Sequence, residues 1–281
     1  MGIGEVGELL RRSTVHVRIT GPRRQSAGSG VVWDAAGTIV TNAHVLGSET
    51  PLVELWDGRT FPAEVHATDA QRDLAKLKLP ANGLPAATFR DHPVRPGELV
   101  VAVGNPLGFT GALTTGVIHA LGPFSGLGRK PWVQAAIRLA PGNSGGPLAD
   151  AAGNVVGINT MIVHGGIALA VPSAIVNEFV RNGAGPRLGV TVRPVRLNRR
   201  RSLSLLILSI DRGSAAEQAS LLIGDLLIGT EKTRFASAAD LSDAIAEAGS
   251  GRLTLRFLRG DHPREREVVV SFAGRFTREA A

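Results

Sequence analysis

The chain has 281 residues, 43% of them hydrophobic and 20% charged, a balance that fits two folded domains and excludes extended disorder. It contains no cysteine, which excludes disulfides, thiolate metal sites and a cysteine nucleophile. The formal net charge is +7, and most of it lies from Pro186 onward, where 16 Lys and Arg stand against 11 Asp and Glu.

Short β-branched runs separated by Gly, Pro, Asn and Asp dominate residues 13–172, and this close spacing predicts antiparallel sandwiches or barrels. The loop-rich stretch 85–96 divides the runs into two half-domains, at roughly 10–85 and 95–175. A helix is expected at 172–182, opened by Pro172 and Ser173. The expected strands are 14–19, 30–33, 38–41, 52–55, 74–79, 99–103, 116–121, 155–160 and 167–171.

The segment Asn182-Gly-Ala-Gly-Pro186 is typical of a linker, so we expect one domain at 1–183 and another at 186–275. The second part predicts a small α+β domain with a short helix opened by a capping box at Ser214–Glu217. Its other expected elements are strands at 202–210 and 226–228, an amphipathic helix at 238–248, and a closing hairpin of 253–258 and 265–271.

Gly142-Asn-Ser144-Gly-Gly-Pro147 is the most specific motif in the chain. A serine hydroxyl is a weak nucleophile unless a base lies beside it, and the attacked carbonyl needs donors for its oxyanion. The glycines permit φ values that turn the N–H groups of Gly142 and Ser144 toward one point, which makes Gly142, Asn143 and Ser144 the candidate oxyanion hole. The alternative is an ordinary glycine-rich turn.

The candidate base is His44, at the exit of a strand, and the candidate carboxylate is Asp73, just before another strand. Each alone has an ordinary explanation, as a packed histidine or a turn aspartate, and Asp69 and Asp91 compete with Asp73. The order His, Asp, Ser is that of chymotrypsin, however, and it places Ser144 in the other half-domain. The predicted site therefore lies between the two halves.

Four ordered motifs resemble those of the HtrA/Deg family of serine proteases, over nearly the full length of the chain. They are Thr41-Asn-Ala-His44-Val, Asp73-Leu-Ala-Lys-Leu-Lys, Gly104-Asn-Pro-Leu-Gly108 followed by Thr115-Gly-Val-Ile118, and Pro141-Gly-Asn-Ser144-Gly-Gly-Pro-Leu148. The resemblance implies a mostly β fold, with a chymotrypsin-like double β-barrel followed by a PDZ domain.

The resemblance also implies an endopeptidase that cleaves unfolded or damaged proteins without ATP, needing neither cofactor nor metal. It implies a homotrimer, although the N-terminal segment lacks the aromatic residues through which such protomers often trimerise. It points to the periplasm or cell envelope. No signal peptide is visible after Met1 and no apolar run is long enough to span a membrane, so a native start predicts the cytoplasm instead.

The S1 pocket should come from the segment before Ser144 and from the strand near residue 160, and the resemblance implies small or medium aliphatic P1 residues. The candidate pocket residues are Leu139, Ala140, Ile158, Asn159 and Thr160. Arg138, six positions before Ser144, would favour an acidic P1 residue if it pointed inward. We expect it to point outward, because a buried unpaired guanidinium is costly.

Asn143 stands where many trypsin-like enzymes that mature by cleavage carry aspartate. An asparagine cannot form an ion pair with a newly freed N-terminal amine. We therefore expect no zymogen cleavage, with loop ordering controlling activity instead.

Arg187-Leu188-Gly189-Val190 resembles the carboxylate-binding loop of PDZ domains, in which backbone N–H groups hold a peptide C-terminus. Gly213–Leu221 with Gly224-Asp225 resembles a further PDZ signature. Leu241 and Ile245 on helix 238–248 are the expected groove wall. The alternative is a small domain that only packs on the protease.

Two other functions remain open from the sequence. One is a chaperone or peptide-binding protein without proteolytic activity on the same scaffold. The other is nucleic-acid binding through the basic run Arg196-Leu-Asn-Arg-Arg-Arg201, which the absence of interleaved aromatic residues disfavours against a solvated loop.

Overall fold

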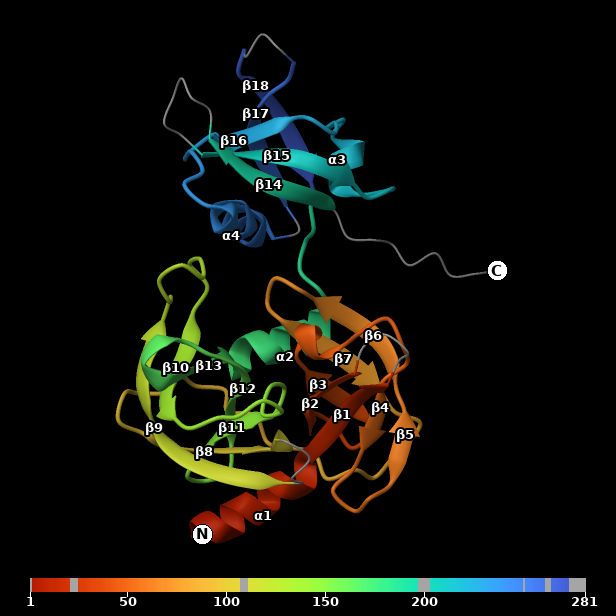
Figure 1. Cartoon of the computed structure of the whole chain (residues 1–281), viewed down its shortest axis with the longest axis vertical. Coiled ribbons are helices and arrows are strands. Elements are labelled where there is room, and N and C mark those ends of the chain that lie inside the picture. Colours follow the sequence, from red (N-terminus) through yellow and green to blue (C-terminus); the bar gives the residue numbers. More distant parts are fainter. Residues whose placement is uncertain are drawn as a thin grey trace. The chain divides into compact units, whose positions relative to one another are not determined.

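The computed structural model describes residues 2–20, 25–106, 111–196, 203–249, 251–260 and 264–272. The chain forms two compact units, both drawn in Figure 1. Unit 1 consists of Met1–Pro123 with Pro131–Ala184, and unit 2 consists of Phe124–Lys130 with Gly185–Ala281.

Unit 1 begins with helix α1 (Ile3–Ser13), which leads directly into an antiparallel sheet with the strand order β5-β4-β1-β2-β3-β7-β6. In β1 the side chains of Val15, Val17 and Ile19 are buried while His16 and Arg18 are partly exposed, the alternation that a strand with one buried face requires. The strands are β1 (Thr14–Thr20), β2 (Gln25–Val32), β3 (Thr38–Thr41), β4 (Leu52–Glu54), β5 (Thr60–Pro62), β6 (Glu64–Asp69) and β7 (Leu74–Lys78).

The second half of unit 1 is a closed barrel with the strand order β10-β13-β12-β11-β8-β9. Small and branched apolar side chains fill its interior, among them Val100, Ala102, Leu148 and Ala170. Helix α2 (Ser173–Asn182) follows the last strand, and Phe179 on its inner face is fully buried. The strands are β8 (Leu99–Gly104), β9 (Ala112–Gly122), β10 (Trp132–Ile137), β11 (Pro147–Asp150), β12 (Val155–Ile162) and β13 (Ile167–Pro172).

The mostly β fold predicted from the strand pattern is confirmed. The second half closes into a barrel as expected, whereas the described strands of the first half are hydrogen-bonded as a sheet with β5 and β6 at its edges. Helix α1 and strands β5, β6, β10 and β11 were not expected. Among the helices that the structure describes, none combines the length and apolar character of a membrane-crossing segment.

Unit 2 contains a five-stranded antiparallel sheet with the order β14-β15-β16-β17-β18. Ser214 caps α3 by accepting a hydrogen bond from the N–H of Glu217 at 3.3 Å, and Gly249 ends α4 with a φ of 53°, both where the sequence indicated. The elements are β14 (Val190–Arg196), β15 (Leu203–Ile210), α3 (Ala215–Gln218), β16 (Leu226–Thr230), α4 (Ala238–Ala248), β17 (Arg252–Leu258) and β18 (Arg266–Ser271).

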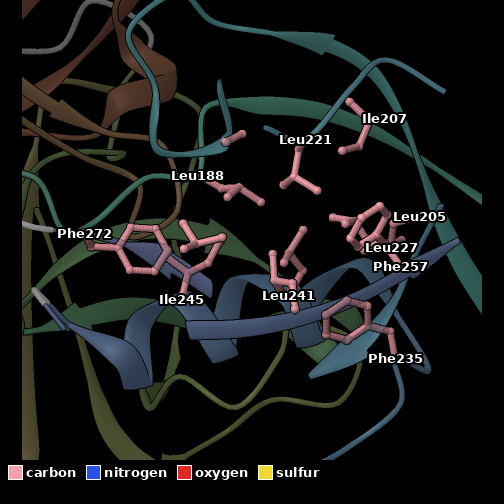
Figure 2. Close-up of a cluster of buried hydrophobic side chains, with 13 residues drawn as sticks. Leu188, Leu205, Ile207, Leu221, Leu227, Phe235, Leu241, Ile245, Phe257 and Phe272 are labelled. Atoms are coloured by element: carbon pink, nitrogen blue, oxygen red, sulfur yellow. The ribbon is translucent and has the colours of Figure 1, made fainter. Parts of the chain in front are cut away.

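Side chains from the sheet and both helices of unit 2 meet in one apolar cluster (Figure 2). Leucines of the sheet, such as Leu205 and Leu227, pack there with Leu241 and Ile245 of α4. Phe235 and Phe272 complete the cluster. The unit therefore has a hydrophobic core of its own.

Candidate active site

His44 and Asp73 lie side by side because strands β3 and β7 pair, with Thr41 opposite Ala75. His44 is in the short 3-10 helix η1 (Ala43–Val45) just after β3, and Asp73 immediately precedes β7. The imidazole Nδ1 of His44 is 2.8 Å from Oδ2 of Asp73, and the backbone N–H of His44 donates to Oδ1 at 3.1 Å. Both carboxylate oxygens thus hold this histidine.

The backbone of Asp73 is in the left-handed region, with a φ of 55°. A non-glycine residue adopts this conformation at a cost, and such strain gathers at functional sites. The buried side chain of Asn42 donates from Nδ2 to the carbonyl of Asp73 at 2.8 Å, which holds the strained residue in place. Asn42 was quoted in the sequence only as part of a motif, and the structure gives it this contact.

Thr160 connects the Asp73 carboxylate to Ser144. Its hydroxyl donates to Oδ2 of Asp73, and its carbonyl accepts a hydrogen bond from Ser144 Oγ at 3.1 Å. The pairing of β11 with β12 and the bond from Gly145 N to Asn159 O, 2.8 Å, bring Ser144 to this position. The structure therefore gathers the three predicted residues around Thr160, with the serine hydroxyl bonded to a carbonyl and not to the imidazole.

Electrostatics keep the histidine and the aspartate in complementary states. The hydrogen bond to Asp73 raises the pKa of His44 above its ordinary value, although partial burial acts in the opposite direction. Burial acts to raise the pKa of Asp73, but the hydrogen bonds from His44 and Thr160 outweigh it and hold that pKa below its ordinary value. An ionised carboxylate only accepts, so Nδ1 of His44 carries a proton and Nε2 is left as the basic atom.

The segment before Ser144 is a type II turn. Asn143 N donates to the carbonyl of Ala140 at 3.0 Å, Pro141 occupies the second position, and Gly142 at the third has a φ of 103°. The side-chain amide of Asn143 donates to the same carbonyl at 3.1 Å. Among the described residues, the N–H groups of Gly142 and Ser144 have no acceptor, so these two donors are available to a ligand while that of Asn143 is not.

Ser29 on β2 attaches this turn to the first sheet, a role that no sequence pattern indicates. Its hydroxyl donates to the carbonyl of Gly142 at 2.7 Å, and its backbone N–H donates to the carbonyl of Ser144 at 2.8 Å. The same hydroxyl accepts from Asn105 N at 2.9 Å, and the side chain of Thr41 donates to the Ser29 carbonyl at 2.7 Å. Ser29 is fully buried, so losing any one of these hydrogen bonds would leave a buried donor or acceptor without its partner.

The predicted pocket residues divide into two groups. Leu139 and Ala140 are partly exposed and precede the turn. Thr160 is buried and its hydroxyl is bonded to Asp73, but its carbonyl adjoins Ser144. Ile158 and Asn159 are fully buried in the barrel, where their side chains offer no surface to a substrate. The side chain of Arg138 is exposed, as the cost of burying it indicated.

The predicted peptide-binding residues of unit 2 also divide. Arg187 is exposed, and Gly189 and Val190 are partly exposed. Leu188, Leu241 and Ile245 are buried in the apolar cluster of Figure 2, which they share with the sheet.

Residues 28–158 match the family model of the trypsin-like peptidase domain. The chain is 35% identical over 266 residues to the putative serine protease HhoA of Synechocystis, an alignment that covers 83% of this chain and 68% of that protein. It is 32% identical over 256 residues to a probable periplasmic serine endoprotease DegP-like of Hahella chejuensis, which covers 84% of this chain and 55% of the relative. Both relatives are longer than this chain.

Solved structures resemble the chain across both units. The serine endoprotease from Yersinia pestis matches with a TM-score of 0.67 and 25% identity, covering 96% of this chain and 97% of that one. The HtrA-type protease AlgW with a tripeptide matches with a TM-score of 0.64 and 27% identity, covering 95% of each chain.

Proposed function

We propose that this chain, which belongs to the HtrA/DegP-type family of trypsin-like serine proteases, is a serine endopeptidase. In this proposal Ser144 is the nucleophile, His44 is the general base and Asp73 is the carboxylate that orients the histidine. The observation that carries the proposal is the continuous series of hydrogen bonds from His44 through Asp73 and Thr160 to Ser144. The N–H groups of Gly142 and Ser144, which have no acceptor among the described residues, supply the remaining requirement, a place for the oxyanion.

In this mechanism the Ser144 hydroxyl leaves the Thr160 carbonyl and bonds Nε2 of His44. His44 takes the proton as Oγ attacks the scissile carbonyl carbon, and the carbonyl oxygen accepts from the N–H groups of Gly142 and Ser144. The imidazolium, stabilised by Asp73, gives its proton to the leaving amine. Water then hydrolyses the acyl-enzyme by the same proton path.

The proposal is tested by labelling with a fluorophosphonate probe. We expect wild-type protein to be labelled on Ser144, located by mass spectrometry of the digested adduct, and to cleave β-casein. His44→Ala keeps the hydroxyl but removes the base, so labelling should become far slower. A folded wild-type protein that takes no label and leaves β-casein intact would favour the non-proteolytic chaperone.

Ser29 is, in this proposal, a positioning residue for the oxyanion turn. Ser29→Ala removes the donor to the Gly142 carbonyl and should lower kcat about tenfold, because the turn that aims the Gly142 N–H loses its support, while KM changes little. Steady-state kinetics on a peptide substrate measure the two constants separately. Ser29→Thr keeps the hydroxyl and should restore part of kcat.

Ser173→Ala is the matched control, because it also removes a buried hydroxyl bonded to a carbonyl, that of Arg90 at 2.6 Å. Both alanine variants should lose a similar amount of stability, about 1–3 kcal/mol, but only Ser29→Ala should lose kcat. If Ser29→Ala and Ser173→Ala have equal kcat, Ser29 has no positioning role.

The substrates in this proposal are unfolded or damaged polypeptides with small or medium aliphatic P1 residues. Leu139, Ala140 and Thr160 remain the candidate pocket residues, and the exposed Arg138 supplies no buried charge for an acidic P1 side chain. The DegP-like relative is named periplasmic, which supports a cell-envelope location, tested by fractionation of cells.

For the domain organisation we propose a protease domain at 1–183 and a PDZ domain at 186–275 that captures peptide C-termini. The two residues before β14, Leu188 and Gly189, support this, because their carbonyls are bound and their N–H groups have no acceptor among the described residues. Leu188 O accepts from Ala216 N and Gly189 O from Asp211 N, both at 2.9 Å. Consecutive free N–H groups suit a carboxylate.

A further inference from the structure

Strand β14 is the edge strand of the unit 2 sheet, and among the described residues no strand pairs with its outer side. Its partner β15 shows which residues of β14 face outward. Ile207 of β15 donates to Asp225 O and accepts from Gly224 N, both at 2.9 Å, so its backbone groups face away from β14. Antiparallel pairs alternate between bonded and non-bonded, so Val192, which lies opposite Ile207, turns its own N–H and C=O to the free edge.

The start of the strand agrees with this assignment. Asp211 N donates to Gly189 O at 2.9 Å. In an antiparallel ladder such a bond lies next to a non-bonded pair, which here is Val190 with Ile210. The backbone N–H and C=O of Val190 therefore also point to the free edge. By the same alternation the next outward residue after Val192 is Pro194, which lies opposite Leu205.

Proline has no backbone N–H, and its ring occupies the space where that hydrogen would point. A peptide added to this edge could form backbone hydrogen bonds with Val190 and Val192. At Pro194 the peptide would find a carbonyl acceptor but no N–H donor for its own carbonyl. We propose that Pro194 ends the added strand, so that unit 2 recognises a captured peptide through roughly its last three or four residues, whatever precedes them. This inference rests on the proposed capture of peptide C-termini.

The occupant is a free C-terminus because the open N–H groups of Leu188 and Gly189 come directly before the outward edge. A carboxylate held there sets the register, with the last peptide residue near Val190 and the third from the end opposite Val192. The fifth from the end would fall at Pro194.

The experiment uses the full chain carrying Ser144→Ala, so that peptides are not cleaved. Fluorescent peptides of four, six and eight residues share their last four residues and a free C-terminus, and fluorescence polarisation gives Kd. With Pro194 present, we expect Kd to be nearly independent of length. In Pro194→Val the eight-residue peptide should bind about two- to tenfold more tightly, because the missing donor is restored, while the four-residue peptide is unchanged.

Val192→Pro is the matched variant, since it removes an outward N–H two residues earlier and leaves the bonds to β15 in place. It should weaken all three peptides alike, and thermal unfolding checks that unit 2 remains folded at the assay temperature, because Val192 also packs against the apolar cluster. If the affinity of the wild-type protein rises with peptide length as steeply as that of Pro194→Val, Pro194 does not end the added strand. The proposed capture of peptide C-termini would still stand. If free and amidated peptides bind equally, or none binds, the PDZ proposal itself is wrong.

Discussion

Ser144→Ala should lower kcat/KM for a peptide substrate by about 10⁴- to 10⁶-fold, the range in which removal of a serine nucleophile leaves only binding and oxyanion stabilisation. The fold should be retained, because within the described part of the chain the Ser144 hydroxyl makes one hydrogen bond, to the Thr160 carbonyl at 3.1 Å, in a partly exposed position. Losing that bond costs about 1 kcal/mol. Kinetics and thermal unfolding on the same preparation measure both effects.

Ser214→Ala provides the contrasting control. This hydroxyl caps α3 in unit 2, so its loss should reduce the stability of that unit by about 1 kcal/mol without changing hydrolysis. Residual Ser144→Ala activity above one hundredth of wild type, resistant to further purification, would show that another residue performs the attack.

Asp73→Asn should reduce kcat by about 10⁴-fold, because an amide can hold the imidazole in the wrong tautomer and does not stabilise its charged form. It should also change the pH dependence. The hydrogen bond to Asp73 raises the pKa of His44, and a protonated imidazole cannot accept the serine proton. Wild-type kcat/KM should therefore fall as the pH drops through that raised pKa, and Asp73→Asn should move this acid limb to lower pH.

Asp91→Asn is the control for both effects. Asp91 lies 3.1 Å from Nδ1 of His92, a comparable contact, but both side chains are exposed and lie outside the gathered site. This variant should keep the wild-type rate and pH profile. An acid limb that stays in place in Asp73→Asn would mean that His44 is not the group that titrates.

Local patterns carried much of the prediction. The expected strand 38–41 has the observed bounds of β3, and helix 238–248 those of α4, because β-branched runs and caps define such elements within a few neighbouring residues. Helix α1 was not expected, since it buries only two large apolar side chains, Val6 and Leu10, among glycines and charged residues. It packs against β8 of the barrel as well as β1 of the sheet, contacts that a local pattern does not show.

Contacts between distant segments were beyond sequence reasoning. Nothing near Ser29 indicates that it bonds Gly142, 113 residues away, and Thr160 was assigned to the pocket without its bond to Asp73. The one local signal at Ser29 is its place between two glycines. In α4, the spacing of Leu241 and Ile245 identified one face of the helix, but that face packs in the core, which spacing alone does not distinguish from a groove.

The turn of residues 140–143 is held by neutral partners throughout: a peptide N–H, the amide of Asn143 and the hydroxyl of Ser29. None of them gains or loses a proton between mild acid and mild alkali, and ionic strength screens none of them appreciably. Inactivation in mild acid should then arise from the imidazole alone and should reverse fully on neutralisation, and added electrolyte should leave the oxyanion donors aligned.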